Sequence, residues 1–231
     1  MAFKDGDFLE VEYSTWNTSD SRLIATTDQG EAKKAGIFND KGRYGPVLVI
    51  LGSNGVIKGL DKELRNMQAG EKKKFTFKPE DAFGQRSENL VRVMPLSDFK
   101  ERDINPEPGM QVNIDDTTAI VKSVNSGRVV VDANHPYAGR DVTYEVKIVK
   151  LLTTEQEKID ALGDTYNVKP SSAQIKDKQA EVIFDDKVKK DADYFIGKAS
   201  LVASAFNYLG GIEKIVVKEE YTRPKQESPN K

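Results

Sequence analysis

The sequence predicts an α+β fold in which an antiparallel sheet wraps on a short helix. Three features indicate this. Strand patterns of alternating polar and apolar residues occur near residues 10 and 145. Between them, a glycine turn leads into a short helix, and a series of short strands then separates this helix from the second long strand. We expect three units: residues 1–86 with 137–152, a small β-rich insert over 87–136, and a small α+β unit over 153–231.

The first unit opens on a strand, DFLEVEYSTW, whose alternation predicts an exposed face with Phe8 and the glutamates and a buried face with Leu9, Val11 and Tyr13. LIATT is a second strand, and DQGEAKKAGIF is a loop or a helix. A buried strand follows over 47–51, then a glycine turn, a helix ending near Met67, and the strand KKKFTF. RDVTYEVKIVKLL is a long strand that we expect to pair with the first.

Turn and cap signals predict the other two units. In the insert, signals such as NPEPG and NSG separate four short strands. TTEQEKIDALGDTY predicts a helix with a threonine cap, and SAQIKD, AEVIFDD and IEKIVVKEEY predict strands. ADYFIGKASLVASAFNYLGG predicts an amphipathic helix, and RPKQESPNK a disordered tail.

Composition excludes several classes of function. With 35 basic and 37 acidic residues, neither nucleic acid nor an anionic membrane has an electrostatic reason to bind. The longest apolar run, VLVIL, is too short to cross a bilayer, and the acidic amino terminus is unlike a signal peptide. Cysteine is absent, which excludes disulfides and thiolate metal sites. We expect a cytoplasmic protein with no cofactor and no metal.

Residues 44–84 are the segment that best indicates which type of reaction the protein could catalyse. Val56 and Ile57 pass directly from a turn into a helix, so they can form the floor of an apolar cleft. No serine, cysteine or histidine stands where a nucleophile would be needed. Such a cleft suits a substrate whose reaction is a rotation about a bond.

GPVLVILGSNGVIKGLDKEL…MQAGEKKKFTF…EDAFG resembles the central segment of the FK506-binding proteins (FKBPs), which are peptidyl-prolyl cis–trans isomerases. ENLVRVMPLSDF and VVVDANHPYAG are similar to the two ends of the insert that SlyD-like and archaeal long-type members carry in the flap over the active site. The resemblance covers about residues 5–152. It implies an FKBP-type half-barrel, prolyl isomerisation, and a chaperone insert that binds proline-containing unfolded polypeptides.

The resemblance also implies site residues. The catalytic positions are Tyr13, Ile24, Ala25, Leu51, Val56, Ile57, Leu60, Phe83 and Tyr144. Substrate-binding positions are Val47 and Val49 in the cleft and Leu90, Val91, Val93, Met94, Leu96, Phe99 and Met110 in the insert. Ile57 is expected to offer its backbone N–H to a substrate carbonyl, Leu60 to form the pocket floor, and Tyr13 to lie beside Tyr144.

Three positions depart from the family pattern. Ala25 replaces a usual acidic residue, Leu60 a common tryptophan, and Phe83 a tyrosine whose hydroxyl would bond a ligand carbonyl. These changes weaken the expectation of macrolide binding more than the expectation of isomerisation. Taken alone, Tyr13 and Tyr144 are also typical of core aromatics, and His135 beside Pro136 is typical of a structural turn.

Two alternatives remain open. The protein is a holdase whose altered cleft has no catalytic activity, or it is an interaction module that recognises a partner's proline motif. The interaction module would form a homodimer through residues 153–231, and such a homodimer is also a possible partner interaction of the isomerase.

Overall fold

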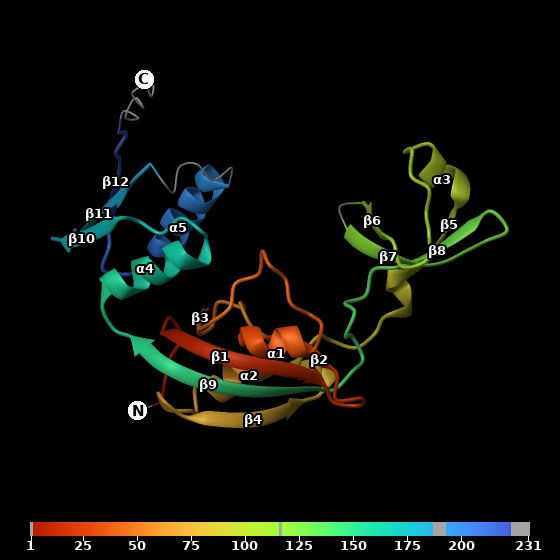
Figure 1. Cartoon of the computed structure of the whole chain (residues 1–231), viewed down its shortest axis with the longest axis horizontal. Coiled ribbons are helices and arrows are strands. Elements are labelled where there is room, and N and C mark those ends of the chain that lie inside the picture. Colours follow the sequence, from red (N-terminus) through yellow and green to blue (C-terminus); the bar gives the residue numbers. More distant parts are fainter. Residues whose placement is uncertain (1, 116, 187–192, 223–231) are drawn as a thin grey trace, which may run out of the picture.

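A curved antiparallel sheet forms the base of the protein (Figure 1). The computed structural model describes residues 2–115, 117–186 and 193–222. The strand order is β2-β1-β9-β4, with β3 also paired to β1. The strands of this sheet are β1 (Phe8–Asn17), β2 (Leu23–Thr26), β3 (Val47–Ile50), β4 (Lys72–Phe77) and β9 (Val142–Leu152). The predicted α+β class is confirmed.

The first and last strands of this unit pair along their whole length, from Phe8 opposite Leu152 to Asn17 opposite Val142. Their predicted pairing is therefore confirmed. Because side chains alternate along a strand, one face of β1 points toward helix α2 (Lys58–Leu64) and packs with its apolar residues. The segment that was predicted as a loop or a helix forms helix α1 (Gln29–Lys34), capped by the Asp28 side chain.

Phe8 corrects the expected division of β1 into a buried and an exposed face. Its side chain is fully buried, and it packs with Leu152 in the core of the carboxy-terminal unit. The ring of Phe8 lies edge-on to that of Tyr208, with the centroids 6.4 Å apart. Strand periodicity predicts two faces, but it does not reveal that a second unit covers one of them.

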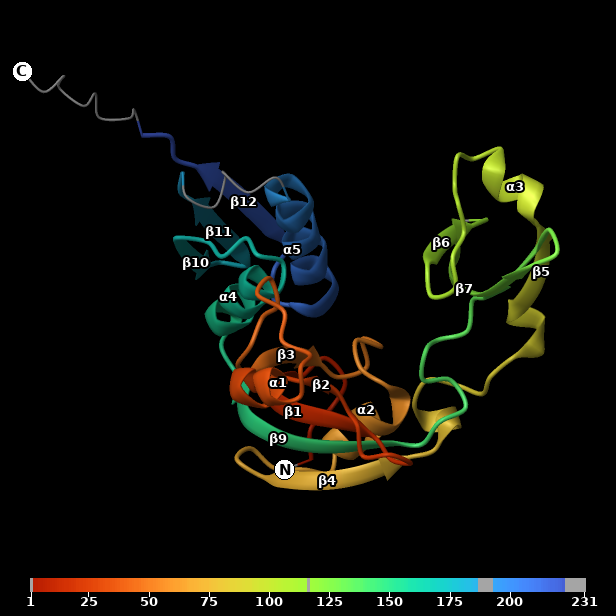
Figure 2. The same ribbon diagram turned by 45° about the vertical axis from the view of Figure 1, so that its right-hand side comes forward.

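The insert has its own sheet, in the order β5-β8-β7-β6, and its own core. The four predicted strands are present as β5 (Val91–Pro95), β6 (Gln111–Ile114), β7 (Thr117–Asn125) and β8 (Arg128–Asp132). A short helix, α3 (Leu96–Lys100), was not predicted. Figures 1 and 2 show this unit standing apart from the base on two chain segments.

The carboxy-terminal unit is a small α+β structure at the other end of the base (Figures 1 and 2). Its elements are α4 (Glu155–Thr165), β10 (Ser172–Lys176), β11 (Gln179–Phe184), α5 (Tyr194–Tyr208) and β12 (Lys214–Glu219). Thr154 and Glu157 form the capping box that the sequence suggests. The tail predicted to be disordered, 223–231, lies outside the described residues. Among the described helices, none has the length and apolar character needed to span a bilayer.

Candidate active site

One apolar cluster between the sheet and α2 brings the predicted cleft residues together. Leu60 and Tyr144 are buried in it, whereas Tyr13 and Ile57 are half-buried at its edge. The ring centroids of Tyr13 and Tyr144 lie 5.9 Å apart, so the two tyrosines are neighbours as expected. Other half-buried members of the cluster are Ile24, Val56, Phe75, Ala82 and Phe83. The cluster therefore joins a solid floor to an accessible apolar rim.

The start of α2 places a free backbone donor at this rim. Ile57 is the N-cap residue, with φ −59° and ψ 148°, and helix geometry leaves the first N–H groups without partners in the helix. No hydrogen bond joins the Ile57 N–H to any other described residue. Gly59 lets the helix sit close to β4, because a Cβ there would overlap the ring of Phe77. The Ile57 N–H is thus available to a ligand.

The two tyrosines of the site are neutral near pH 7, and burial strengthens this preference. Burial raises the pKa of both Tyr13 and Tyr144 above the ordinary value of a phenol. Ala25 pairs with Thr15 across β1 and β2 and offers no carboxylate. The site thus combines apolar surface, neutral hydroxyl groups and a backbone N–H, which suits binding and orientation rather than proton transfer.

Two predicted cleft residues lie deeper than expected. Val49 is 4% exposed and Leu51 is 1% exposed, because both point into the cluster under the strands that cover them. They form part of the buried side of the cluster, together with Leu60 and Tyr144. Val47 and Ala25 are half-buried on β3 and β2.

The predicted client-binding residues of the insert do not share one groove. Along β5, Val91 and Val93 point to one face of the sheet, and Met94 points to the other. Phe99 was predicted to bind substrate, but its side chain is 3% exposed and packs from α3 into the core of the insert. Leu90, Val93 and Met110 are exposed, while Val91, Met94 and Leu96 are half-buried.

A small hollow does open on the insert. Its volume is about 100 Å³, and its lining is largely apolar, with the Arg92–Asp115 ion pair included. The lining residues are Leu90, Arg92, Ile114, Asp115, Thr117, Ala119, Val131 and Ala133. Of the residues predicted to bind substrate, only Leu90 is among them. Ile114, Ala119 and Val131 were missed because only the fold brings these strand residues to one spot.

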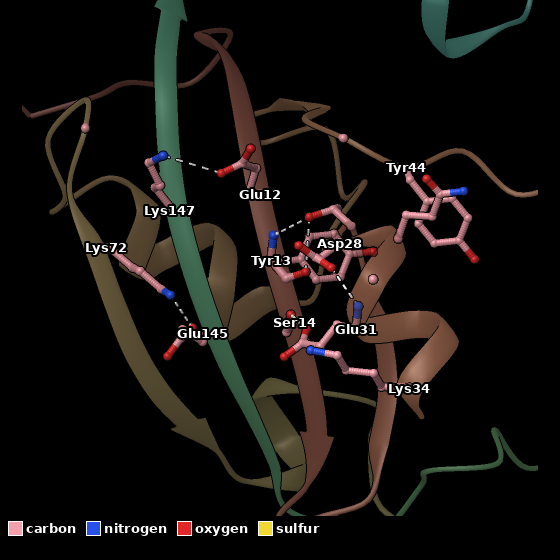
Figure 3. A pocket seen from close by; sticks show the side chains of 15 residues that line it. Glu12, Tyr13, Ser14, Asp28, Glu31, Lys34, Tyr44, Lys72, Glu145 and Lys147 are labelled. Atoms are coloured by element: carbon pink, nitrogen blue, oxygen red, sulfur yellow. Dashed lines mark hydrogen bonds and ion pairs between the residues drawn. The ribbon is translucent and has the colours of Figure 1, made fainter. Parts of the chain in front are cut away.

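A larger hollow, of about 940 Å³, lies on the opposite face of the base sheet, beside α1 (Figure 3). Figure 3 shows Lys147 next to Glu12 and Lys72 next to Glu145; these ion pairs measure 3.5 and 2.5 Å. Because its lining is mostly polar and charged, this hollow does not suit an apolar proline ring.

The structure brings His135, which the sequence had assigned to a structural turn, to the edge of the predicted cleft. The His135 ring stacks on Phe83, with the centroids 4.1 Å apart and the planes 8° apart. His135 lies in the segment that leads from the insert back to β9. Its position beside Phe83 therefore depends on how this segment returns to the base sheet. No local pattern in NHPYAG signals that contact.

A polar network holds the two segments that join the insert to the base. The Asp132 carboxylate, 3% exposed, accepts hydrogen bonds from the Arg86 guanidinium at 2.6 Å and from the Asn134 side chain at 2.8 Å. The Asn134 amide also bonds the Ser87 backbone N–H and C=O, at 2.8 and 2.9 Å. Burial alone would raise the pKa of Asp132, but the hydrogen bonds from Asn134 and Arg86 outweigh it and lower the pKa, so this carboxylate stays ionised.

Comparison with known proteins agrees with this geometry. Residues 1–100 match the family of FKBP-type peptidyl-prolyl cis-trans isomerases, and residues 92–137 match the family described as FKBP26, IF domain. The short-type peptidyl-prolyl cis-trans isomerase of Methanocaldococcus jannaschii is 29% identical over 154 residues, which are 67% of this chain and 97% of that protein.

Two bacterial relatives match shorter parts of the chain. The probable FKBP-type 16 kDa peptidyl-prolyl cis-trans isomerase of Pseudomonas fluorescens is 30% identical over 109 residues, which are 45% of this chain and 71% of the relative. The FKBP-type isomerase SlyD of Vibrio cholerae is 36% identical over 118 residues, which are 49% of this chain and 58% of that protein. The resemblance of the signature segment is thereby confirmed, and the chain belongs to the FKBP-type peptidyl-prolyl cis–trans isomerase family.

Proposed function

We propose that this protein accelerates X-Pro rotation in unfolded or partly folded polypeptides and that the insert captures these clients. The observation that carries the catalytic part is the cluster in which half-buried Tyr13 and Ile57 surround the buried floor of Leu60 and Tyr144. We expect the protein to act in the cytoplasm, which its lack of cysteine supports.

Catalysis of this reaction requires mainly that the protein binds the twisted amide. Rotation about the bond before proline meets a barrier of about 18–20 kcal/mol because the planar amide is stabilised by resonance. The twisted transition state is less polar, so a water-poor apolar surface favours it over either planar state. The Ile57 N–H would hold a flanking carbonyl while the proline ring packs over Leu60. This route requires no nucleophile and no proton transfer from carbon.

Exposed apolar side chains support the proposed client binding by the insert. Leu90 is 41% exposed, Val93 is 62% exposed and Met110 is 39% exposed. A small sheet with two edge strands can also bind an extended chain by strand addition, and methionine adapts to varied sequences. Since the insert is covalently joined to the prolyl site, a captured segment would meet that site at a raised effective concentration.

An isomerisation assay on a short X-Pro peptide, by exchange NMR or by coupled proteolysis, tests the catalytic proposal. We expect turnover by the unaltered protein and about a tenfold loss in Tyr13→Ala, because an aromatic wall of the site is removed. Tyr44→Ala is the matched control, since Tyr44 stacks on Phe38 outside the cluster.

Aggregation suppression, measured on the same proteins, separates the alternatives. Suppression without any turnover at micromolar protein would favour the holdase. Tight binding of one proline motif, with neither turnover nor suppression, would favour the interaction module.

We further propose that the carboxy-terminal unit forms a homodimer through the outer face of α5. Tyr194, Leu201 and Ala205 bury the inner face of this helix, whereas Phe195 and Phe206 on the outer face are 71% and 48% exposed. Ile196, beside them, is 70% exposed. A two-fold interface could cover the same apolar stripe of both copies at once.

Sedimentation velocity tests the dimer. The full chain is expected to sediment at twice its 25.7 kDa mass. Phe195→Glu combined with Phe206→Glu is expected to sediment as a monomer, because two charges would have to be buried. Val93→Glu, an equally exposed change in the insert, is the control and should remain dimeric. A monomeric parent protein would contradict this proposal.

A further inference from the structure

One buried hydroxyl of the base sheet has no hydrogen-bond partner. Among the described residues, Thr15 Oγ1 is the single buried side-chain oxygen or nitrogen that lacks one. Thr15 lies on β1 and is 1% exposed. A buried polar group without a partner costs stability, because it has lost its hydrogen bonds to water and gained none in the protein. Such groups are rare in folded proteins, so the Thr15 hydroxyl needs an explanation.

The register of the sheet places Thr15 on the face that holds the prolyl site. Thr15 pairs with Ala25 on β2 and with Tyr144 on β9. Tyr144 in turn pairs with Phe75 on β4, and both belong to the apolar cluster of the site. Directly paired residues point to the same face of a sheet, so these four side chains form one row. Within the row, Ala25 has no polar side-chain atom, and the Tyr144 hydroxyl is the one group that Thr15 Oγ1 could bond.

The Tyr144 hydroxyl is close to Thr15, but it is not sealed in the core. Burial raises the pKa of Tyr144, and the neighbouring Thr15 hydroxyl opposes this effect and lowers the pKa. Within the described part of the chain, no hydrogen bond of standard geometry engages the Tyr144 hydroxyl, yet this oxygen is not among the buried atoms without a partner. It is therefore accessible from outside, at the accessible side of the cluster.

We propose that Thr15 is a positioning residue of the prolyl site, whose hydroxyl donates to Tyr144 Oη and turns the phenolic hydrogen toward a backbone carbonyl of the bound peptide. A hydroxyl that accepts one hydrogen bond donates a stronger one, so the two groups act as a chain. Ala25 provides no carboxylate that could orient a hydroxyl group in this row. The Thr15 hydroxyl would gain its partner only with peptide bound, which favours the bound state. This inference rests on the proposed isomerase function.

Thr15→Val and Thr15→Ser separate the hydroxyl of Thr15 from the shape of its side chain. Valine has nearly the shape of threonine but no hydroxyl, whereas serine keeps the hydroxyl and loses a methyl group. We expect kcat/KM on a short X-Pro peptide to fall about three- to tenfold in Thr15→Val and to stay within about twofold of the parent protein in Thr15→Ser. Because Thr15→Val also removes a buried group without a partner, its Tm should rise. A residue that serves only the fold would not show higher stability together with lower activity.

Thr143→Val is the matched control. Thr143 is the neighbour of Tyr144 on β9 and points to the opposite face of the sheet. Its hydroxyl is hydrogen-bonded to those of Thr18 and Thr76, at 2.9 and 3.1 Å. The same substitution should therefore lower Tm here and leave kcat/KM within about twofold of the parent protein.

Tyr144→Phe tests whether Thr15 acts through the Tyr144 hydroxyl. It should lower kcat/KM at least as much as Thr15→Val does. Adding Thr15→Val to Tyr144→Phe should cause no further loss, because the group that Thr15 orients is already absent.

Unchanged kcat/KM or a lower Tm in Thr15→Val, or losses that multiply in the double variant, would each overturn the assignment. If the parent protein turns over peptide and Thr15→Val does so equally well, only the role of Thr15 fails. If the parent protein has no turnover, the proposed function itself fails, and this inference fails with it.

Discussion

Ile57→Pro is expected to lower kcat/KM for X-Pro peptides by tenfold or more while leaving the fold intact. The substitution removes the one backbone donor that the start of α2 offers to a ligand. Leaving the substrate carbonyl unpaired in a water-poor site costs about 1–3 kcal/mol, which corresponds to about five- to 160-fold in rate. The φ angle of Ile57, −59°, is already that of proline, so the backbone need not change.

The loss in Ile57→Pro should come from the missing N–H and not from the altered side chain. Ile57→Val is the matched control, because it keeps the N–H and a β-branched apolar side chain and should retain most of the activity. Circular dichroism and thermal unfolding check that α2 persists. Leu60→Ala is a poorer test, because Leu60 is 1% exposed and its truncation would cost about 2–5 kcal/mol of stability. Unchanged turnover in Ile57→Pro would remove the N–H of Ile57 from the proposed mechanism.

Deleting the body of the insert is expected to separate peptide isomerisation from chaperone activity. Ser87 and Asn134 are hydrogen-bonded to one another, so residues 88–133 can be replaced by a short glycine linker that keeps Asn134 and His135. The insert has a separate hydrophobic core, and its removal takes no side chain from the core around Leu60. Turnover of a short peptide should therefore stay within a few-fold of that of the parent protein.

The same deletion should strongly impair catalysis of the refolding of a protein whose rate-limiting step is prolyl isomerisation. Capture next to the catalytic site raises the local client concentration, and such linkage is worth about 10²–10⁴ in apparent affinity. We expect the deletion variant to lose most of its effect on refolding and on aggregation. Ile57→Pro should show the reverse pattern, with slow peptide turnover and intact aggregation suppression. Full refolding activity without residues 88–133 would rule out client capture by the insert.

Local pattern was sufficient for much of the fold. KKKFTF is strand β4 over Lys72–Phe77, as its composition and flanking turns predict. The threonine cap before α4 is present, because capping depends on side chains only three residues apart. The pairing of β1 with β9 was also predictable, since both are long alternating strands at the two ends of one unit. Resemblance supplied the residues of the prolyl cluster.

Contacts between segments that are distant in the sequence determined the burial of several residues and the contacts around the predicted cleft. Phe8 has the spacing of an exposed residue but is buried because the carboxy-terminal unit covers it, and Phe99 is buried because α3 turns it into the core of the insert. His135 reaches Phe83 only through the path by which the chain returns from the insert. The sequence by itself determined most of the elements and the apolar chemistry of the cleft, because periodicity, caps and residue types act over a few positions. Only the tertiary structure decided which surfaces are covered and which polar groups face the site, because burial depends on partners that are far away along the chain.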